Sequence, residues 1–198
     1  MKSLKKISLV IIAAFAMSAT TVVESKYVLS KNYTVTILGT SNLHSWNETV
    51  EMVSGDGSVT WNEDGSFNLG AIHLKMEVHS IKSDMGSIMN NNTYKALKAD
   101  KNPEIIFTLT TPVNSIKAGT ASTTISAKGT LSIAGVTRPI DMNVKVSIQD
   151  HTVLSFEGSQ TIKMTDYNIS PPTALFGTLK TGDEITINFK TNFTVTAN

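Results

Sequence analysis

The sequence predicts an all-β protein: an antiparallel barrel of eight or nine strands with one short helical insert around residues 85–100. Apolar and polar residues alternate over most of the chain, which is typical of strands that bury one face. Short turns rich in Gly, Asn and Asp separate these runs, so consecutive strands are joined directly. Several runs are about 10–13 residues long, against about 5–6 for a mean strand, and this length favours a barrel over a two-sheet sandwich.

The N-terminal segment, residues 1–18, has the features of a signal peptide. Three lysines in the first six residues precede an apolar run at residues 7–16, and small residues allow cleavage after Ala16 or Ser18. An N-terminal membrane anchor is the alternative, but the apolar run is too short to span a bilayer. We therefore expect an exported protein, periplasmic or secreted, whose residues 25–197 form a single barrel domain.

The charge balance and the missing cysteines exclude several classes of function. The chain has 17 Lys and Arg residues against 16 Asp and Glu residues. Loss of the three N-terminal lysines leaves 14 basic residues against 16 acidic ones, with no basic run, so nucleic-acid binding has no electrostatic support. The absence of cysteine excludes thiolate metal sites, a catalytic thiol and a lipid-modified N-terminal cysteine.

In the first half of the chain, alternation predicts strands at residues 27–37, 44–53, 58–61 and 67–81, with a Gly-rich turn at residues 55–57. The last of these runs alternates most clearly, because every second residue between 73 and 79 is His, Lys or Glu and suits a face in contact with water. The apolar side chains expected to line the interior from this half are Tyr33, Val35, Ile72, Leu74 and Met76.

The insert interrupts the strand pattern between residues 85 and 103. Residues 90–93 (NNNT) offer capping side chains, and residues 93–99 are helical in composition. Pro103 ends the helical stretch, because the residue before a proline is pushed out of the α region. The side chains of the insert expected to cover one end of the barrel, as a lid or plug, are Met85, Met89, Tyr94 and Leu97.

The second half repeats the pattern of strands joined by turns. It predicts strands at residues 105–109, 123–133, 140–148, 154–164 and 183–196. A long irregular loop at residues 165–182 contains two consecutive prolines. The side chains expected to line the interior from this half are Ile105, Phe107, Met142, Val144 and Phe189. An eight-stranded barrel is just wide enough inside for side chains or one slender ligand.

The chain contains no phosphate-binding Gly-rich loop, no G-x-S-x-G and no H-E-x-x-H motif. No two carboxylates form a recognisable acid and base pair, so the sequence predicts neither an enzyme nor a bound cofactor. His73 and His79 share the outer face of one strand, but their spacing is too wide for a compact metal site. His44 and Trp46 are candidates for polar groups at the barrel rim, and a structural hydrogen bond is the alternative role for His44.

Four sequence blocks, taken together and in order, resemble the YceI-like family. They are GTSNLHSW at residues 39–46, YKALKADKNPEIIF at residues 94–107, GTLSIAGVTRPI at residues 129–140, and MTDYNI with GDEITI at residues 164–169 and 182–187. The resemblance extends over essentially all of the chain beyond the N-terminal segment, with the blocks in the right order. This resemblance implies a lipocalin-like antiparallel barrel, secreted or periplasmic in bacteria.

The resemblance also implies a function. Several members of the family hold a long isoprenoid or acyl lipid, so we expect an isoprenoid-type or other long-chain lipid here, held for carriage, storage or protection of the envelope under stress. The protein would contact a membrane at most peripherally, as a monomer or a homodimer. The alternative is a solidly packed barrel without a ligand, in which residues 85–103 and 165–182 are surfaces for partner proteins. A hollow or a filled interior distinguishes the two hypotheses.

Overall fold

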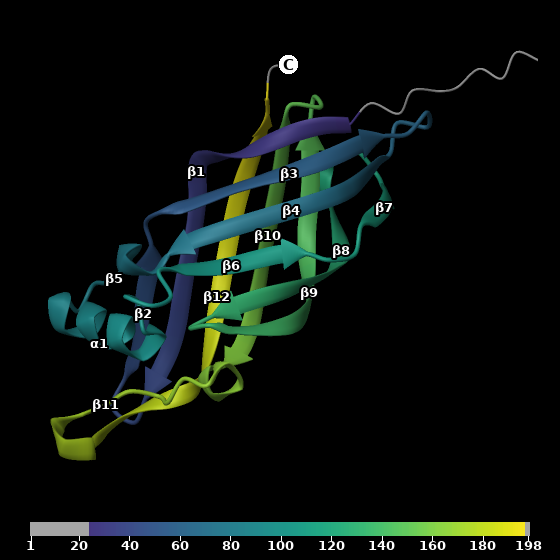
Figure 1. Ribbon diagram of the computed structural model, residues 1–198. Helices are drawn as coiled ribbons and strands as arrows, with labels where there is room; N and C mark the ends of the chain where they lie inside the picture. Colours follow the sequence, from purple (N-terminus) through teal and green to yellow (C-terminus); the bar gives the residue numbers. More distant parts are fainter. Residues whose placement is uncertain (1–23, 197–198) are drawn as a thin grey trace, which may run out of the picture.

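A closed antiparallel barrel of eight strands forms the body of the protein, which confirms the predicted fold class (Figure 1). The computed structural model describes residues 24–196, so the predicted signal peptide at residues 1–18 and residue 197 lie outside the described residues. Strand β12 pairs with β1 and closes the barrel. The strands that form it, in order around the barrel, are β1 (Glu24–Ser41), β3 (Val53–Trp61), β4 (Phe67–Glu77), β6 (Glu104–Leu109), β8 (Gly119–Ile133), β9 (Val136–Gln149), β10 (Val153–Lys163) and β12 (Leu179–Val195).

Short elements are added at the ends of this barrel. They are the strands β2 (Ser45–Val50), β5 (Ile81–Ser83), β7 (Val113–Ile116) and β11 (Thr173–Ala174), the 3₁₀ helices η1 (Val78–Ser80), η2 (Met164–Tyr167) and η3 (Leu175–Gly177), and the helix α1 (Ser87–Leu97). The segment predicted as an irregular loop, residues 165–182, thus contains a short strand and two helical turns. No helix in residues 24–196 combines the length and the apolar character needed to cross a bilayer.

Strand β3 runs through the turn that the sequence predicted at residues 55–57, so that prediction is wrong. Gly55 pairs with Leu74 and Gly57 with Ile72. A Cβ atom on Gly57 would lie 2.7 Å from the Ile72 side chain, and one on Gly55 would lie 2.9 Å from that of Leu74. The two glycines do not bend the chain. Their missing side chains instead leave room for the side chains of β4 to lie over the β3 backbone.

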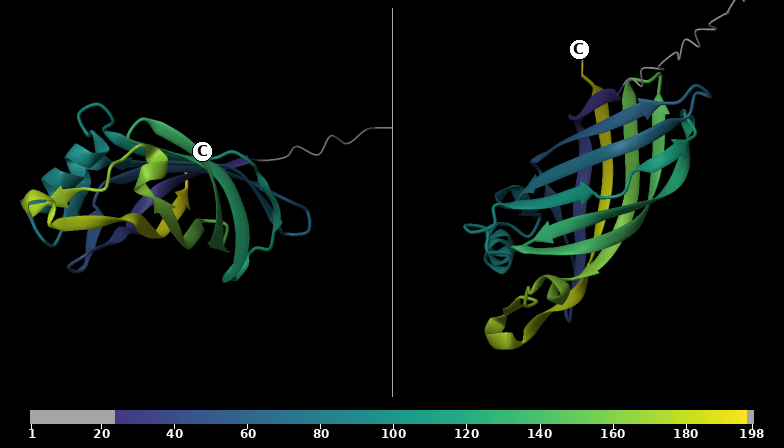
Figure 2. Two further views of the ribbon diagram at one scale, coloured as in Figure 1. Left: turned by 90° about the horizontal axis from the view of Figure 1, so that it is seen from below. Right: turned by 45° about the vertical axis from the view of Figure 1, so that its right-hand side comes forward.

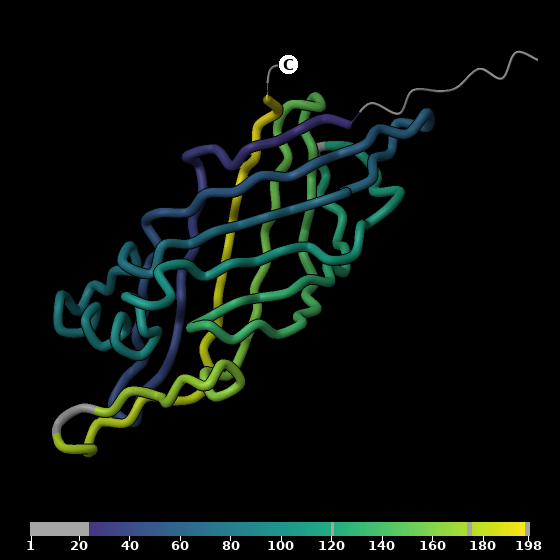
Figure 3. The backbone as a smooth tube through the Cα atoms, viewed as in Figure 1, coloured from purple at the N-terminus to yellow at the C-terminus, as the bar shows by residue number. Residues whose placement is uncertain are grey.

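Strand β1 bends sharply along its length (Figure 3). Its first part pairs with β3 and its last part pairs with β2. The pairing of β1 with β12 is irregular between the pairs Leu29–Phe193 and Tyr33–Thr191. From one pair to the next, β1 advances by four residues and β12 by only two. Extra residues on one strand of a pair form a bulge, which bends that strand and re-aims its side chains.

Helix α1 begins six residues earlier than the sequence predicted. Gly86 precedes the helix with a φ of 87°, a conformation that favours glycine, and the helix ends where Lys98 adopts the left-handed conformation. The predicted capping asparagines lie inside the helix. The side-chain oxygen of Asn90 instead accepts a hydrogen bond from the backbone N–H of Ser83 at 2.8 Å, which ties α1 to β5.

The two ends of the barrel differ. One end is packed solid by side chains that are at most 1% exposed, among them Tyr27, Phe67, Leu154 and Phe193. The Tyr27 hydroxyl donates to the backbone oxygen of His151 at 2.7 Å and ties this end together. Helix α1 and the segment that carries β11 lie together at the opposite end (Figures 1 and 2).

Candidate functional site

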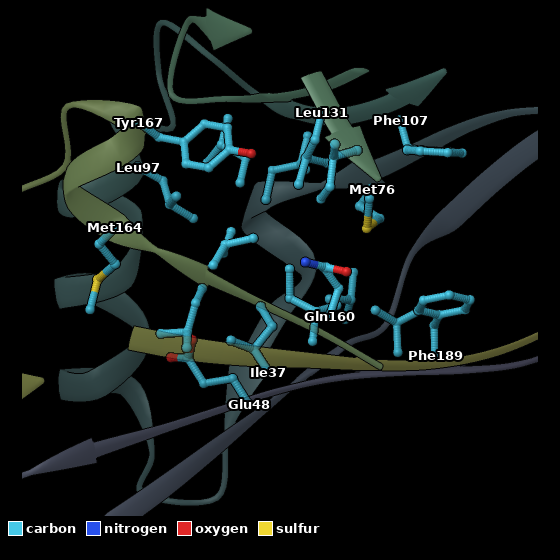
Figure 4. Close-up of a pocket in the computed structure, with 18 of the residues that line it drawn as sticks. Ile37, Glu48, Met76, Leu97, Phe107, Leu131, Gln160, Met164, Tyr167 and Phe189 are labelled. Carbon is cyan, nitrogen blue, oxygen red and sulfur yellow. The ribbon is translucent and has the colours of Figure 1, made fainter. Parts of the chain in front are cut away.

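An apolar cavity of about 230 Å³ occupies the barrel between the solid end and helix α1 (Figure 4). One water needs about 10–15 Å³ of such space, so the interior is hollow and is not packed like an ordinary core. Along β12 the wall extends from Thr191 to Leu179. At about 3.4 Å per residue this stretch of strand measures about 40 Å, and because strands in a barrel tilt by about 40°, the cavity is a tube about 30 Å long along the barrel axis.

Nine of the ten residues predicted to line the interior lie in the wall of this cavity. They are Val35, Ile72, Leu74, Met76, Ile105, Phe107, Met142, Val144 and Phe189. They come from β1, β4, β6, β9 and β12, so most of the circumference contributes. Whether they contact a lipid stays a prediction.

The expectation that Tyr33 lines the cavity is wrong. Its hydroxyl donates to the backbone oxygen of Glu51 at 2.8 Å and accepts from the N–H of Val53 at 3.0 Å. These bonds hold the side chain in the corner between β1 and the start of β3, next to the β1 bulge. Tyr33 therefore links β1 to the start of β3 and does not line the cavity.

Two of the four residues predicted to form a lid line the cavity. Met89 and Leu97 line the cavity from α1, and Asn92, Thr93 and Ala96 of the same helix do so as well. Met85 precedes the helix and is 54% exposed, so it lies outside the cavity wall.

Tyr94, the fourth lid residue, points to β5 and not to the cavity. Its hydroxyl lies 2.9 Å from the backbone oxygens of both His79 and Ile81, and it accepts a hydrogen bond from Lys82 Nζ at 2.7 Å. Tyr94 thus holds the helix in place beside the barrel.

Of the two predicted rim residues, Trp46 reaches the cavity and His44 does not. The Trp46 ring lies over Gly39, where a Cβ atom would meet it, and its Nε1 donates to the backbone oxygen of Thr40 at 3.1 Å. His44 is exposed in the turn between β1 and β2, with its Nδ1 3.1 Å from the backbone oxygen of Ser45.

Glycines keep the tube open by letting aromatic rings lie against its wall. The Phe189 ring lies over Gly158, and the Phe107 ring lies over Gly129. A Cβ atom at Gly158 would lie 2.5 Å from the Phe189 ring, and one at Gly129 would lie 2.6 Å from that of Phe107. Any larger residue at these glycines would therefore push a ring into the cavity.

The sequence analysis missed Glu48, a carboxyl in the wall of this apolar cavity that is 3% exposed. Its Oε1 accepts a hydrogen bond from the Thr93 hydroxyl of α1 at 2.6 Å. Burial raises the pKa of Glu48, and the Thr93 hydrogen bond opposes this by lowering it. The alternation in β2 was the available signal, since Trp46, Glu48 and Val50 all point inward.

A model of the YceI-like domain matches residues 19–193 of the chain. The chain belongs to the YceI-like family. No curated protein sequence gives a significant match.

Several solved structures share the YceI-like fold. A polyisoprenoid binding domain from Saccharophagus degradans, described as implicated in plant cell wall breakdown, is 14% identical, with a TM-score of 0.69 over 87% of this chain and 99% of that chain. BcnA from Burkholderia cenocepacia is 18% identical, with a TM-score of 0.56 over 81% of this chain and 95% of that one. The Campylobacter jejuni YceI protein is 17% identical, with a TM-score of 0.56 over 76% and 85% of the two chains.

Glu48 should make the stability of this YceI-like barrel fall as pH rises. Its pKa in the folded state lies above the ordinary 4.5, so the folded protein binds the proton more tightly than the unfolded chain does. The tighter binding of this proton stabilises the folded protein. The stabilisation is complete below pH 4.5 and is lost as pH rises through the raised pKa of Glu48. We expect Glu48→Gln, which stays neutral, to raise the free energy of unfolding by about 1 kcal/mol near pH 8 and by about zero near pH 4.

Urea unfolding of Glu48→Gln and of the wild type at both pH values measures this difference. Other titrating groups are common to the two proteins and cancel in the comparison. An equal gain at both pH values would show that the Glu48 charge is not the cause.

His73 lies on the exposed face of β4, as predicted, whereas the placement of His79 on the same strand is wrong, because His79 belongs to η1. The Nδ1 of His73 is 3.4 Å from Asp56 Oδ2, and the Nε2 of His79 is 3.8 Å from Asp100 Oδ1. Within residues 24–196, no group of three or more His, Cys, Asp or Glu residues is placed to hold a metal ion.

Proposed function

We propose that this YceI-like barrel is a binding protein that holds a long-chain lipid, of the isoprenoid type or similar, inside its cavity. The observation that carries the proposal is the apolar tube, which follows β12 for about 40 Å. Its described wall includes no Lys, Arg or His, and most of its side chains are aliphatic or aromatic. Such a tube suits a long and slender apolar molecule better than a compact polar one.

The energetics favour a chain-like ligand over specific polar contacts. Each buried CH₂ group contributes about 0.8 kcal/mol, so a long tail binds strongly with few hydrogen bonds. Isoprenoid chains carry methyl branches, and the flexible Met76, Met89, Met142 and Met164 in the wall adapt to irregular shapes. The fold shared with a polyisoprenoid binding domain supports the isoprenoid class.

Carriage or storage of lipid in the cell envelope is the role we propose for the whole protein. The N-terminal segment supports export to the periplasm or the exterior, because its lysines and apolar run fit a signal peptide. The alternative of a solidly packed barrel is less well supported, since a core of ordinary packing density leaves few voids larger than a water molecule. A role in envelope stress, and the monomeric or dimeric state, stay predictions.

Variants of helix α1 test the proposal. Met89 and Leu97 line the cavity, whereas Met85 and Ile88 are 54% and 78% exposed. We expect the double variant Met89→Ser/Leu97→Ser to bind a polyprenol about tenfold more weakly or worse, because two apolar contacts of the tail become polar. The control variant Met85→Ser/Ile88→Ser should bind like the wild type.

The affinity of each protein is measured by titration with the polyprenol after removal of co-purified lipid, and thermal unfolding of each variant checks its fold. If both double variants bound as tightly as the wild type, helix α1 would not cover the ligand. If no variant and no wild-type protein took up polyprenol or fatty acid, the lipid-binding function itself would be wrong.

A further inference from the structure

Two of the polar side chains in the wall of the tube, Glu48 and Gln160, are linked by a row of paired residues that crosses four strands. Glu48 on β2 pairs with Ile37 on β1, Ile37 pairs with Ile187 on β12, and Ile187 pairs with Gln160 on β10. Directly paired residues in an antiparallel sheet point to the same face, so Glu48 and Gln160 both point into the cavity. Figure 4 shows both side chains with Ile37 between them.

Glu48 is an unusual residue to find there. It is the one carboxyl among the described residues of the wall, and it is buried. Among residues 24–196, Thr93 alone donates a hydrogen bond to it, and that bond uses only Oε1. A carboxylate accepts hydrogen bonds at both of its oxygens, so Oε2 has the capacity to receive a further donor.

We propose that Glu48 recognises the head group of the lipid, and that this head group is an uncharged hydrogen-bond donor such as an alcohol or a phenol. This inference rests on the proposed lipid-binding function and names the class of lipid. The hydroxyl donates to Glu48 Oε2, and the tail fills the part of the tube beyond it. The deep part of the tube is walled by Val35, Phe189 and their neighbours.

Lipids that end in a phosphate or a carboxylate are excluded by the same geometry. No described residue of the wall carries a cationic side chain that could neutralise an anion. An anionic head group beside the Glu48 carboxyl would lose its hydration next to a second acidic group, which costs far more than placing a neutral hydroxyl there. A head group without a donor, such as an ether, would fit the space but leave Glu48 Oε2 unbonded.

Three probes that share one tail and differ in the head group test this inference. They are geranylgeraniol, its methyl ether and geranylgeranyl phosphate. Each is titrated into delipidated wild-type protein, and Trp46, which lies in the cavity wall, reports binding by its fluorescence. We expect the alcohol to bind about tenfold more tightly than the ether and at least about 100-fold more tightly than the phosphate.

The variant Glu48→Leu supplies the matched comparison. It removes the acceptor and keeps an apolar side chain of similar size, so it should fold at least as well as the wild type. We expect it to bind the alcohol and the ether equally, while its affinity for the ether stays close to that of the wild type. A merely structural role for Glu48 would change the affinity for both probes by the same factor.

Two results would overturn the inference. One is binding of the phosphate as tightly as the alcohol by the wild type, and the other is a preference for the alcohol over the ether that persists in Glu48→Leu. Failure of all three probes to bind the wild type is a different outcome, because it contradicts the proposed function as well as the inference.

Discussion

Replacement of Ala127 by Phe is expected to reduce the affinity for a long-chain lipid by at least about 100-fold while the barrel stays folded. Ala127 lies in β8, is 5% exposed, and contributes one of the smallest side chains of the cavity wall. It is two residues from Ile125, which pairs with Val144 on β9, and Val144 in turn pairs with Gly158 on β10. A ring at position 127 therefore projects into the middle of the tube.

The physical reason for the large loss is the length of tail that the ring displaces. Exclusion of only four CH₂ groups from the cavity removes about 3 kcal/mol of binding free energy, which is more than a 100-fold change in Kd. Overpacking costs about 1–3 kcal/mol in a filled core. The added ring fits into the empty cavity, so this strain should be small.

Thr124→Phe is the control for this variant. Thr124 lies on the same strand, but its side chain is exposed on the outer face of the barrel. The control should bind lipid like the wild type. Unchanged binding by Ala127→Phe, in a protein of normal thermal stability, would show that the ligand does not pass through this part of the tube.

The second large effect is expected at the solid end of the barrel. Phe193 is 0% exposed, and its ring packs edge-on against Phe156 with 5.6 Å between the ring centroids. Phe193→Ala should lower the free energy of unfolding by about 3–5 kcal/mol, because it opens a cavity in a packed core.

Phe189→Ala is the matched comparison, since it removes the same side chain from the same strand, four residues away. Phe189 already borders the hollow part of the barrel and is only partly buried. In delipidated protein, measured by urea unfolding, its loss should therefore cost clearly less than the loss of Phe193. Equal costs would mean that the cavity end is packed as tightly as the solid end, contrary to the structure.

Strand periodicity made much of this architecture predictable from the sequence. Side chains two residues apart on a strand share a face, so the alternation in β4 sufficed to place Ile72, Leu74 and Met76 on the cavity side. The same reasoning was incomplete at Tyr33, which keeps the register of the inward-facing Val35 and Ile37. Its hydroxyl bonds to the backbone of Glu51 and Val53, and these long-range contacts hold the side chain at the corner between β1 and β3.

Long-range contacts account for the features that the sequence concealed. Glu48 follows the inward alternation of β2, but its hydrogen-bond donor is Thr93, 45 residues away on α1. The sequence predicted that the asparagines before Thr93 cap the helix. Asn90 instead lies inside the helix and bonds to β5. In both places a polar residue bonds to a partner brought near by the fold, which local preference cannot reveal.

The central claim is that the barrel holds a lipid, and native mass spectrometry of detergent-free protein tests it most directly. The wild type, expressed in bacteria with its signal segment intact, should carry an added mass that organic solvent removes, and the extract should contain a long-chain lipid. The Ala127→Phe variant, prepared in the same way, should show the mass of the polypeptide alone. A wild-type protein with no added mass, and no uptake of polyprenol when it is supplied, would contradict the claim.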